Sequence, residues 1–235
     1  MSKFTGPLQN ADKIGGLRQW FQGLPIGQEP DLCVYFNDFL VAQDYAATDW
    51  VVTTTEAGAG DATEAIAADE ACGALLITND AADNDLDALQ SAEETWRLTA
   101  GKQTWFETRL KISDADQMDL FVGLSITDTT ALASTDQCGF LLADGSAALS
   151  AVTLKDSAGT TTSSVATLAD STYVKLGFHY DGISKIKYFV NRSLVATHTT
   201  GIPDNENLAL TIHVQNGEAV AKTCTIDYFY VAQER

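Results

Sequence analysis

Residues 104–112 read TWFETRLKI, and their alternation indicates the fold. Successive side chains of a β-strand point to opposite faces, so this run has one apolar face and one mostly charged face. The apolar face holds Phe106, Leu110 and Ile112. The opposite face holds Trp105, Glu107, Arg109 and Lys111. We expect such a strand to place one face on a hydrophobic core and to direct the other outward, as in an antiparallel sheet.

Similar runs fill the chain from Leu32 onward. They are short, rich in Val, Ile, Thr and aromatic residues, and separated by clusters of Gly, Asp, Asn and Ser. We predict strands at 32–36, 50–54, 74–78, 95–99, 104–112, 120–126, 138–142, 148–154, 173–180, 185–190, 208–214 and 224–231. Turns at 181–184 and 191–193 predict antiparallel hairpins, because a parallel crossover needs about a dozen residues. With no repeated unit and no long helix expected, the sequence predicts an all-β antiparallel sandwich.

The first thirty residues differ from the rest of the chain. Residues 1–30 contain three of the four prolines and no sustained period of helix or strand. We predict an N-terminal extended arm at 1–30 and one β-sandwich domain at 31–235. Large apolar side chains in the arm need cover, so we expect it to pack on its own domain or on a neighbouring subunit. The candidate partner contacts are Phe4, Leu17, Trp20 and Phe21.

The charge of the chain restricts its partners. It contains 32 acidic and 14 basic residues, a net charge of -18, with a pI near 4.2. Phosphate backbones and anionic lipid surfaces repel such a protein, so we expect neither nucleic acid nor membrane as a partner. The first residues lack the apolar run of a secretory signal, which predicts synthesis in the cytoplasm. Four cysteines without Cys-x-x-Cys spacing are expected to be reduced and mostly buried.

Motifs for catalysis are missing from the predicted strands. Laminarinase-type glycosidases carry Glu-x-Asp-x-(x)-Glu on one strand, whereas residues 104–112 offer only Glu107 and residues 224–231 only Asp227. His179, His198 and His213 fall in separate segments without a nucleophile elbow or a zinc motif. We therefore predict no enzymatic activity, no catalytic residue and no cofactor.

One acidic cluster has the spacing of a calcium loop. Oxygen ligands in such a loop occupy positions 1, 3, 5 and 12, and here those positions are Asp83, Asp85, Asp87 and Glu94. Ala88 stands where the sharp turn of that loop needs glycine. A solvated acidic loop is the first expectation and a surface calcium site the alternative, so no metal ligand is assigned.

A second possible site lies on the charged face of residues 104–112. Sugar binding requires an exposed aromatic platform beside polar groups, and Trp105 with Glu107 and Arg109 would provide one. This is a lectin-like alternative, because a loop or partner covering that face would remove it.

Several segments together resemble the concanavalin A-like jelly-roll proteins encoded among the structural genes of tailed bacteriophages. These segments are Tyr35-Phe36-Asn37-Asp38-Phe39, Ala82-Asp83-Asn84-Asp85, Trp105 to Lys111, Phe121-Val122-Gly123-Leu124, Tyr180-Asp181-Gly182 and Thr225-Ile226-Asp227-Tyr228. The resemblance covers nearly the whole chain.

The resemblance implies a virion structural protein. It suggests a capsid decoration or cement protein that lies on the outer capsid surface, binds the phage major capsid protein and stabilises the shell. The acidic body agrees with an outer position, away from packaged DNA. Lattice symmetry would favour a homo-oligomer, either a dimer or a trimer. The alternative is a carbohydrate-binding, lectin-like module of a phage fibre or secreted protein.

Overall fold

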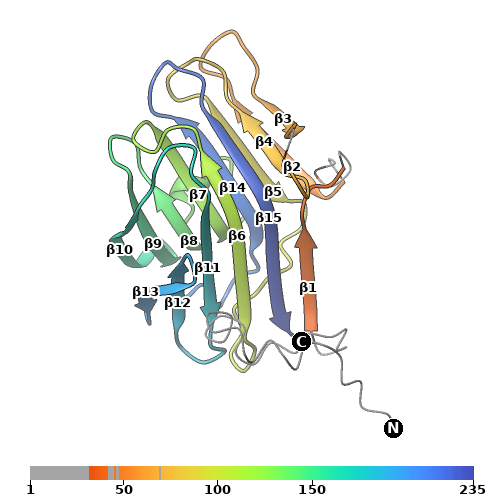
Figure 1. The fold of residues 1–235 in the computed structure, drawn as a ribbon. Helices are drawn as coiled ribbons and strands as arrows, with labels where there is room; N and C mark the ends of the chain where they lie inside the picture. Colours follow the sequence, from red (N-terminus) through yellow and green to blue (C-terminus); the bar gives the residue numbers. More distant parts are fainter. Residues whose placement is uncertain (1–31, 42–44, 46–47, 69) are drawn as a thin grey trace.

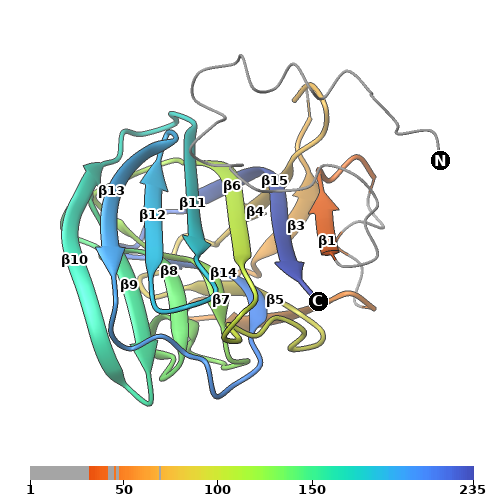
Figure 2. The same ribbon diagram turned by 90° about the horizontal axis from the view of Figure 1, so that it is seen from below.

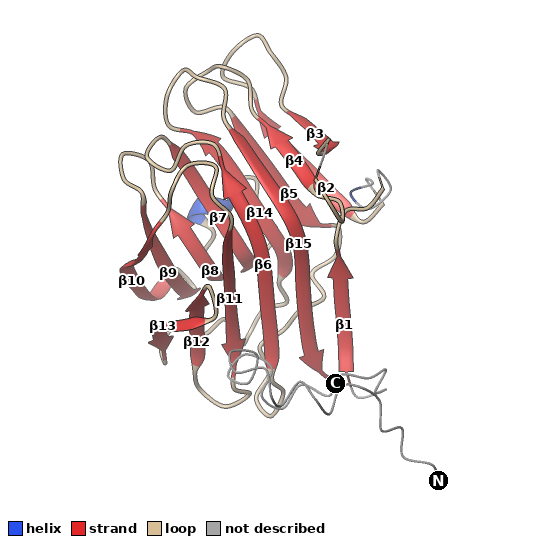
Figure 3. Ribbon diagram, viewed as in Figure 1, coloured by secondary structure: helices blue, strands red, loops and turns tan. Residues whose placement is uncertain are grey.

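The protein is a sandwich of two antiparallel sheets (Figures 1 and 3). A computed structural model describes residues 32–41, 45, 48–68 and 70–235. Figure 2, turned by 90° from Figure 1, shows the sheets as two layers. The candidate contacts Phe4, Leu17, Trp20 and Phe21, and with them the predicted arm, lie outside the described residues.

Sheet A has eight strands in the order β13-β12-β11-β6-β15-β4-β3, with β1 also paired to β15. Its strands are β1 (Leu32–Asn37), β3 (Thr63–Ile66), β4 (Leu75–Thr78), β6 (Thr104–Ile112), β11 (Val174–Tyr180), β12 (Ile186–Val190), β13 (Ser193–His198) and β15 (Thr223–Glu234). The long strand β15 pairs with β6 along one edge. Along its other edge it pairs first with β4 and then with β1.

Sheet B has seven strands in the order β10-β9-β8-β7-β14-β5-β2. Its strands are β2 (Trp50–Thr55), β5 (Leu86–Ser91), β7 (Met118–Ser125), β8 (Gln137–Leu142), β9 (Ala148–Lys155), β10 (Ala158–Thr167) and β14 (Ala209–Asn216). A short 3-10 turn, η3 (Ala131–Ala133), interrupts the loop between β7 and β8. No described helix is long and apolar enough to cross a membrane.

The core between the sheets follows from the predicted alternation. Phe106, Leu110 and Ile112 of β6 all face inward, as expected from TWFETRLKI. Aromatic rings line the centre of this core, and Phe106 stacks on Phe178 with 5.1 Å between ring centroids. Burying such rings removes large apolar areas from water, which is the main force holding the layers together.

Most predicted strands are confirmed, and both predicted hairpin turns form. The carboxylate of Asp181 accepts backbone N–H bonds from residues 183, 184 and 185, which closes the β11–β12 turn. Asn191 and Arg192 adopt positive φ angles of 48° and 68° between β12 and β13. Asn tolerates this left-handed conformation, and two such residues suit a two-residue hairpin turn.

The strand predicted at 95–99 is wrong. Only Trp96 forms a bridge there, paired with Leu208. Trp96 is buried in the core. Its apolar side chain is therefore explained by core packing and does not indicate a hydrogen-bonded strand. Four strands were not predicted, namely β3, β5, β10 and β13. Much of β10 reads as Thr and Ser, and such a polar edge strand gives a weak apolar signal.

Candidate binding face on sheet A

The outward face of sheet A carries the strongest group of polar and aromatic side chains. Strands β1, β15, β6 and β11 lie side by side and present it (Figure 1). Arg109 of β6 is opposite Lys175 of β11 on one side and Tyr228 of β15 on the other. We call this surface the sheet A face.

A β-bulge in β15 decides which side chains reach this face. The register of β15 against β6 shifts between Ile226 and Tyr228, which leaves Asp227 as the extra residue. A bulge breaks the strict alternation of a strand. As a result two consecutive residues, Asp227 and Tyr228, both bond to side chains of β6, namely Arg109 and Glu107.

Glu107 is the buried acid at the centre of the sheet A face. Glu107 is only 5% exposed, and the Tyr228 hydroxyl donates a hydrogen bond to the Glu107 carboxylate. Burial, followed by this bond to Glu107, raises the pKa of Tyr228 far above its ordinary value. Burial also raises the pKa of neighbouring Tyr230, to about 12, with Glu107 adding to the effect. Both tyrosines are therefore neutral phenols at physiological pH.

The cations beside Glu107 are held in place by aromatic and acidic neighbours. The Arg109 guanidinium lies 3.8 Å from the centroid of the Tyr173 ring and 2.5 Å from the Asp227 carboxylate. Lys111 forms an ion pair with Glu70 at 2.5 Å. A cation fixed between a ring and a carboxylate loses much of its rotational freedom, so a ligand meets a preset donor.

An apolar border runs along the β1 side of this face. Val34 and Phe36 point the same way as Tyr228 and Tyr230, because Phe36 pairs with Tyr230 across the ladder. The Phe36 ring is 57% exposed and lies 6.1 Å from the ring of Tyr228. The exposed Phe36 ring, tilted by 40° to that of Tyr228, offers an aromatic face for stacking beside two half-buried phenols.

The expected role of Trp105 as the exposed platform is wrong. Trp105 does share the outward face with Glu107 and Arg109, but its side chain is fully buried. Leu32 and Ala232 pack against it, and its indole stacks on the His179 ring at 5.2 Å. The sequence showed which face Trp105 occupies, but it did not show that β1 would cover the ring. The exposed aromatic residue is Phe36, whose position opposite β15 depends on a pairing between the two ends of the chain.

The acidic run 83–94 does not form a calcium loop. Leu86–Ser91 is strand β5, so the four acids do not converge. Asp85 accepts the backbone N–H of Ala57, and Glu94 accepts the backbone N–H of Thr127, both at 2.7 Å. Within the described ranges, no group of three or more His, Cys, Asp or Glu side chains is arranged to hold a metal ion.

Asp87 instead points between the two sheets. It lies beside the core residue Val214 in the ladder, and both of its carboxylate oxygens are buried without a hydrogen-bond donor among the described residues. Burial raises its pKa well above the ordinary value, and the carboxylate of Glu64, from sheet A, raises it further. Two acids facing each other in a core favour keeping a proton on one of them.

The histidines occupy three separate strands. Thr153 and Thr162 hydrogen-bond the two ring nitrogens of His198 at 2.7 and 2.9 Å. Burial lowers the pKa of His179 and of His213 to about 4 in each case, so both rings are neutral at pH 7. Such separation gives these rings no shared site.

The cysteine prediction is partly confirmed. All four thiols are free, and Cys138 and Cys224 are buried. Burial raises the pKa of Cys224 to about 12. Cys33 and Cys72 are exposed, which corrects the expectation that most are buried.

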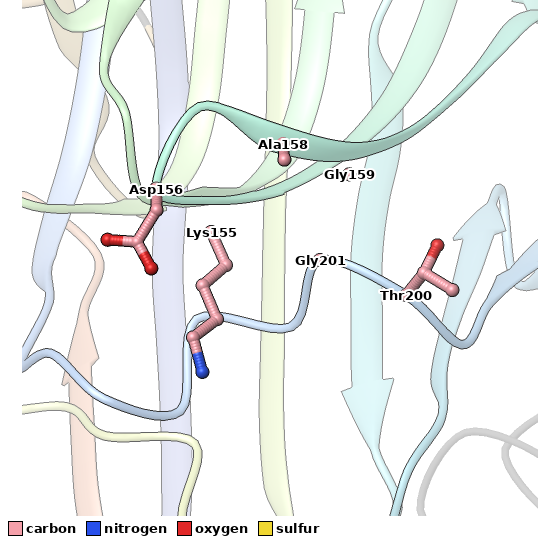
Figure 4. A pocket seen from close by; sticks show the side chains of 6 residues that line it. All are labelled: Lys155, Asp156, Ala158, Gly159, Thr200 and Gly201. Atoms are coloured by element: carbon pink, nitrogen blue, oxygen red, sulfur yellow. The ribbon is translucent and has the colours of Figure 1, made fainter.

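A hollow of about 440 Å³ lies beside β9 and β10, which Figure 1 shows on the side of the sandwich away from β1; Figure 4 shows the residues that line it. Its lining is Lys155, Asp156, Ala158, Gly159, Thr200 and Gly201. The ammonium group of Lys155 is already paired with Asp204 at 2.5 Å. A Cβ atom on Gly201 would lie 2.4 Å from the Cα atom of Gly159, so two backbone segments touch in the lining of this hollow. None of the expected site residues lines it.

Comparison with known proteins gives the fold. No family model matches the sequence, and no curated protein matches it. An endo-1,3-beta-glucanase from Streptomyces sioyaensis superposes with a TM-score of 0.62 at 14% identity, covering 88% of this chain and 98% of the glucanase. The chain has a concanavalin A-like jelly-roll fold.

Two further solved structures share this jelly roll. A protein of unknown function from Shewanella oneidensis MR-1 has a TM-score of 0.61 at 13% identity, covering 100% of this chain and 96% of that protein. The carbohydrate recognition domain of Emp46p has a TM-score of 0.56 at 12% identity, covering 83% and 93%. Enzymes and lectins thus share this jelly roll, and the function must be argued from the site.

Proposed function

We propose that this jelly roll is a non-enzymatic carbohydrate-binding module and that the sheet A face is its binding site. The observation that carries the proposal is the exposed Phe36 ring next to Tyr228, whose hydroxyl is fixed by the buried carboxylate of Glu107. Sugar rings have apolar faces that stack on aromatic side chains and hydroxyls that need fixed polar partners. The sheet A face offers both on three neighbouring strands, β1, β15 and β6.

The module binds its ligand without converting it. The two acids nearest the centre of the face are already engaged, Glu107 by Tyr228 and Asp227 by Arg109. A retaining glycosidase needs two free carboxyl groups about 5 Å apart, one of them a proton donor. The raised pKa of Tyr228 also argues against this phenol as a base at neutral pH. These engaged groups suit recognition better than proton transfer.

The test is a glycan array, followed by titration calorimetry with the glycan that binds. We expect Phe36→Ala to weaken that binding about tenfold, since the loss of one stacking ring costs on the order of 1.4 kcal/mol. Ile183→Ala serves as the control, because Ile183 is an even more exposed apolar residue and lies in the β11–β12 turn. Absence of any glycan ligand, or equal binding by Phe36→Ala, contradicts the proposal.

A second candidate function is capsid decoration, as the phage resemblance implies. Its support is an exposed apolar row at the start of the domain, where Val34 is 50%, Phe36 57% and Leu40 59% exposed. Exposed apolar rows of this kind mark surfaces that bind other proteins. The acidic composition agrees with a place on the outside of a phage head.

Co-sedimentation with undecorated phage heads tests this second candidate. We expect the full chain to sediment with the heads and a chain without residues 1–30 to fold but stay in the supernatant, because the apolar arm supplies much of the contact area. Circular dichroism checks the fold of the truncated protein. Sedimentation of the truncated protein with the heads would refute this role for the arm.

A further inference from the structure

The cations of this acidic protein are concentrated on the sheet A face. Of the 14 Lys and Arg residues, three precede residue 32, which leaves eleven in the sandwich domain. Five of these eleven lie on or beside this face: Arg109, Lys111, Lys175, Lys187 and Arg192. A chain with a net charge of -18 therefore has one surface where positive groups gather.

Two of these cations are opposite each other in the sheet, and a third lies in the turn that continues their row. Arg109 is opposite Lys175 in the β6–β11 ladder. Lys175 is in turn held by Asn191, which accepts its N–H at 3.0 Å and donates its own N–H to the Lys175 carbonyl at 2.8 Å. Arg192 comes next in the same hairpin turn. Like charges directly opposite in a ladder repel each other, so this arrangement costs free energy in the absence of a ligand.

Two cations of the row have no acidic partner. Arg109 is paired with Asp227, but among the described residues neither Lys175 nor Arg192 forms an ion pair. The Nε atom of Arg192 is buried without a hydrogen-bond acceptor. Buried polar groups are normally satisfied. Because Arg192 forms no ion pair among the described residues, its guanidinium keeps an uncompensated positive charge that can form charge-assisted hydrogen bonds with an anion.

Both unpaired cations are close to the aromatic part of the site. The Lys175 ammonium lies 6.0 Å from the Tyr228 ring centroid. Arg192 is near enough for its charge to lower the pKa of the Tyr228 phenol, opposing the larger upward effect of burial. A ligand stacked on Phe36 and Tyr228 thus has positive charge at its side.

We propose that the sheet A face binds an anionic polysaccharide, with carboxylate or sulfate groups of the sugar lying between Lys175 and Arg192. This inference rests on the proposed carbohydrate-binding function and names its ligand class. Carboxylate and sulfate present the same chemistry to a guanidinium, namely oxygens that accept charge-assisted hydrogen bonds. The stacked rings provide affinity, and the unpaired cations select acidic over neutral sugars.

The test measures how tightly the full chain binds four probes, by affinity electrophoresis and calorimetry. The probes are polygalacturonate, dextran sulfate, neutral dextran and duplex DNA. We expect at least one of the two acidic polysaccharides to bind at least tenfold more tightly than dextran, with affinity that falls as salt is raised. Polygalacturonate and dextran sulfate distinguish a uronate from a sulfate ligand.

A pair of matched variants tests the residues. We expect Lys175→Gln/Arg192→Gln to lose at least tenfold in binding of the acidic polysaccharide. Lys155→Gln/Arg97→Gln also removes one Lys and one Arg, both near Asp204 and away from this face, and should change binding less than twofold. Circular dichroism confirms that both variants fold.

The results of these experiments distinguish the inference of an acidic ligand from the proposed carbohydrate-binding function. Binding of a neutral glycan as tight as that of the acidic ones overturns the inference and leaves carbohydrate binding intact. Failure of every glycan overturns both. Equal binding of DNA and the acidic polysaccharides overturns the inference, because the face would then be a general polyanion surface, as would equal losses in the two double variants.

Discussion

At the scale of single residues, titratable groups that are buried or half-buried oppose one another in their effect on stability. The pKa values of His179 and His213 fall from 6.5 to about 4 on folding, so between these values the unfolded chain binds more protons. Stability due to the histidines therefore rises with pH up to about 6.5. Asp87 has a raised pKa, so the folded chain binds more protons and its contribution falls as pH rises above 3.8.

These signs predict the pH dependence of stability. Burial also lowers the pKa of His198, so three histidines outweigh Asp87 below about pH 6.5, whereas above that value the histidines contribute no further change and the effect of Asp87 continues. We expect urea unfolding to show greatest stability near pH 6.5 and a decline by pH 8. Asp87→Asn should remove that decline, since the amide is neutral at both pH values, and should stabilise the protein at pH 8 by about 1–3 kcal/mol.

Asp83→Asn is the control, because Asp83 is exposed in the adjoining loop. An equal loss of stability between pH 6.5 and pH 8 in the wild type and in Asp87→Asn would show that another group causes the decline.

At the scale of elements, the central pair β7–β8 depends on two glycines. Gly123 and Gly139 face each other across the ladder. A Cβ atom on Gly139 would lie 2.3 Å from the carbonyl oxygen of Val122, so any side chain forces the strands apart. We expect Gly139→Ala to lower the free energy of unfolding by about 1–3 kcal/mol, measured by urea denaturation.

Ser150→Ala on the neighbouring strand β9 is the comparison, since it removes only a hydroxyl. If Gly139→Ala lowers the free energy of unfolding by less than about 0.5 kcal/mol, the strands β7 and β8 can move apart at little cost, and the close approach of the two glycines is not required for stability.

Some features of the site at the level of strands could be predicted from the sequence, and others could not. The alternation in 104–112 placed Glu107 and Arg109 outward correctly, because period-2 patterns reflect strand geometry directly. The bulge at Asp227 has no such local signal, and it brings Tyr228 to Glu107. The pairing of β1 with β15 joins residues about 200 positions apart, so neither the burial of Trp105 nor the partner of Phe36 followed from neighbouring residues.

At the scale of the whole molecule, the sandwich architecture followed from composition and periodicity, whereas the charge distribution did not. The net charge of -18 correctly describes the average surface. It conceals the row of Arg109, Lys175 and Arg192, which forms only when β6, β11 and the β12–β13 turn become neighbours. The total charge led us to expect neither nucleic acid nor membrane as a partner, and we propose the sheet A face as a local surface that attracts anions of another class.

The attachment of β1 has a mechanical consequence. Leu32 pairs with Glu234, one residue from the C-terminal Arg235, and the ladder runs away from that end. A force that pulls residue 32 and residue 235 apart acts at one end of this ladder. It therefore loads the hydrogen bonds between β1 and β15 one after another, in the unzipping geometry. We expect the six pairs of β1 to separate in sequence at low force, because each pair bears the load alone, so that β1 can detach and lengthen the chain while the two sheets stay packed.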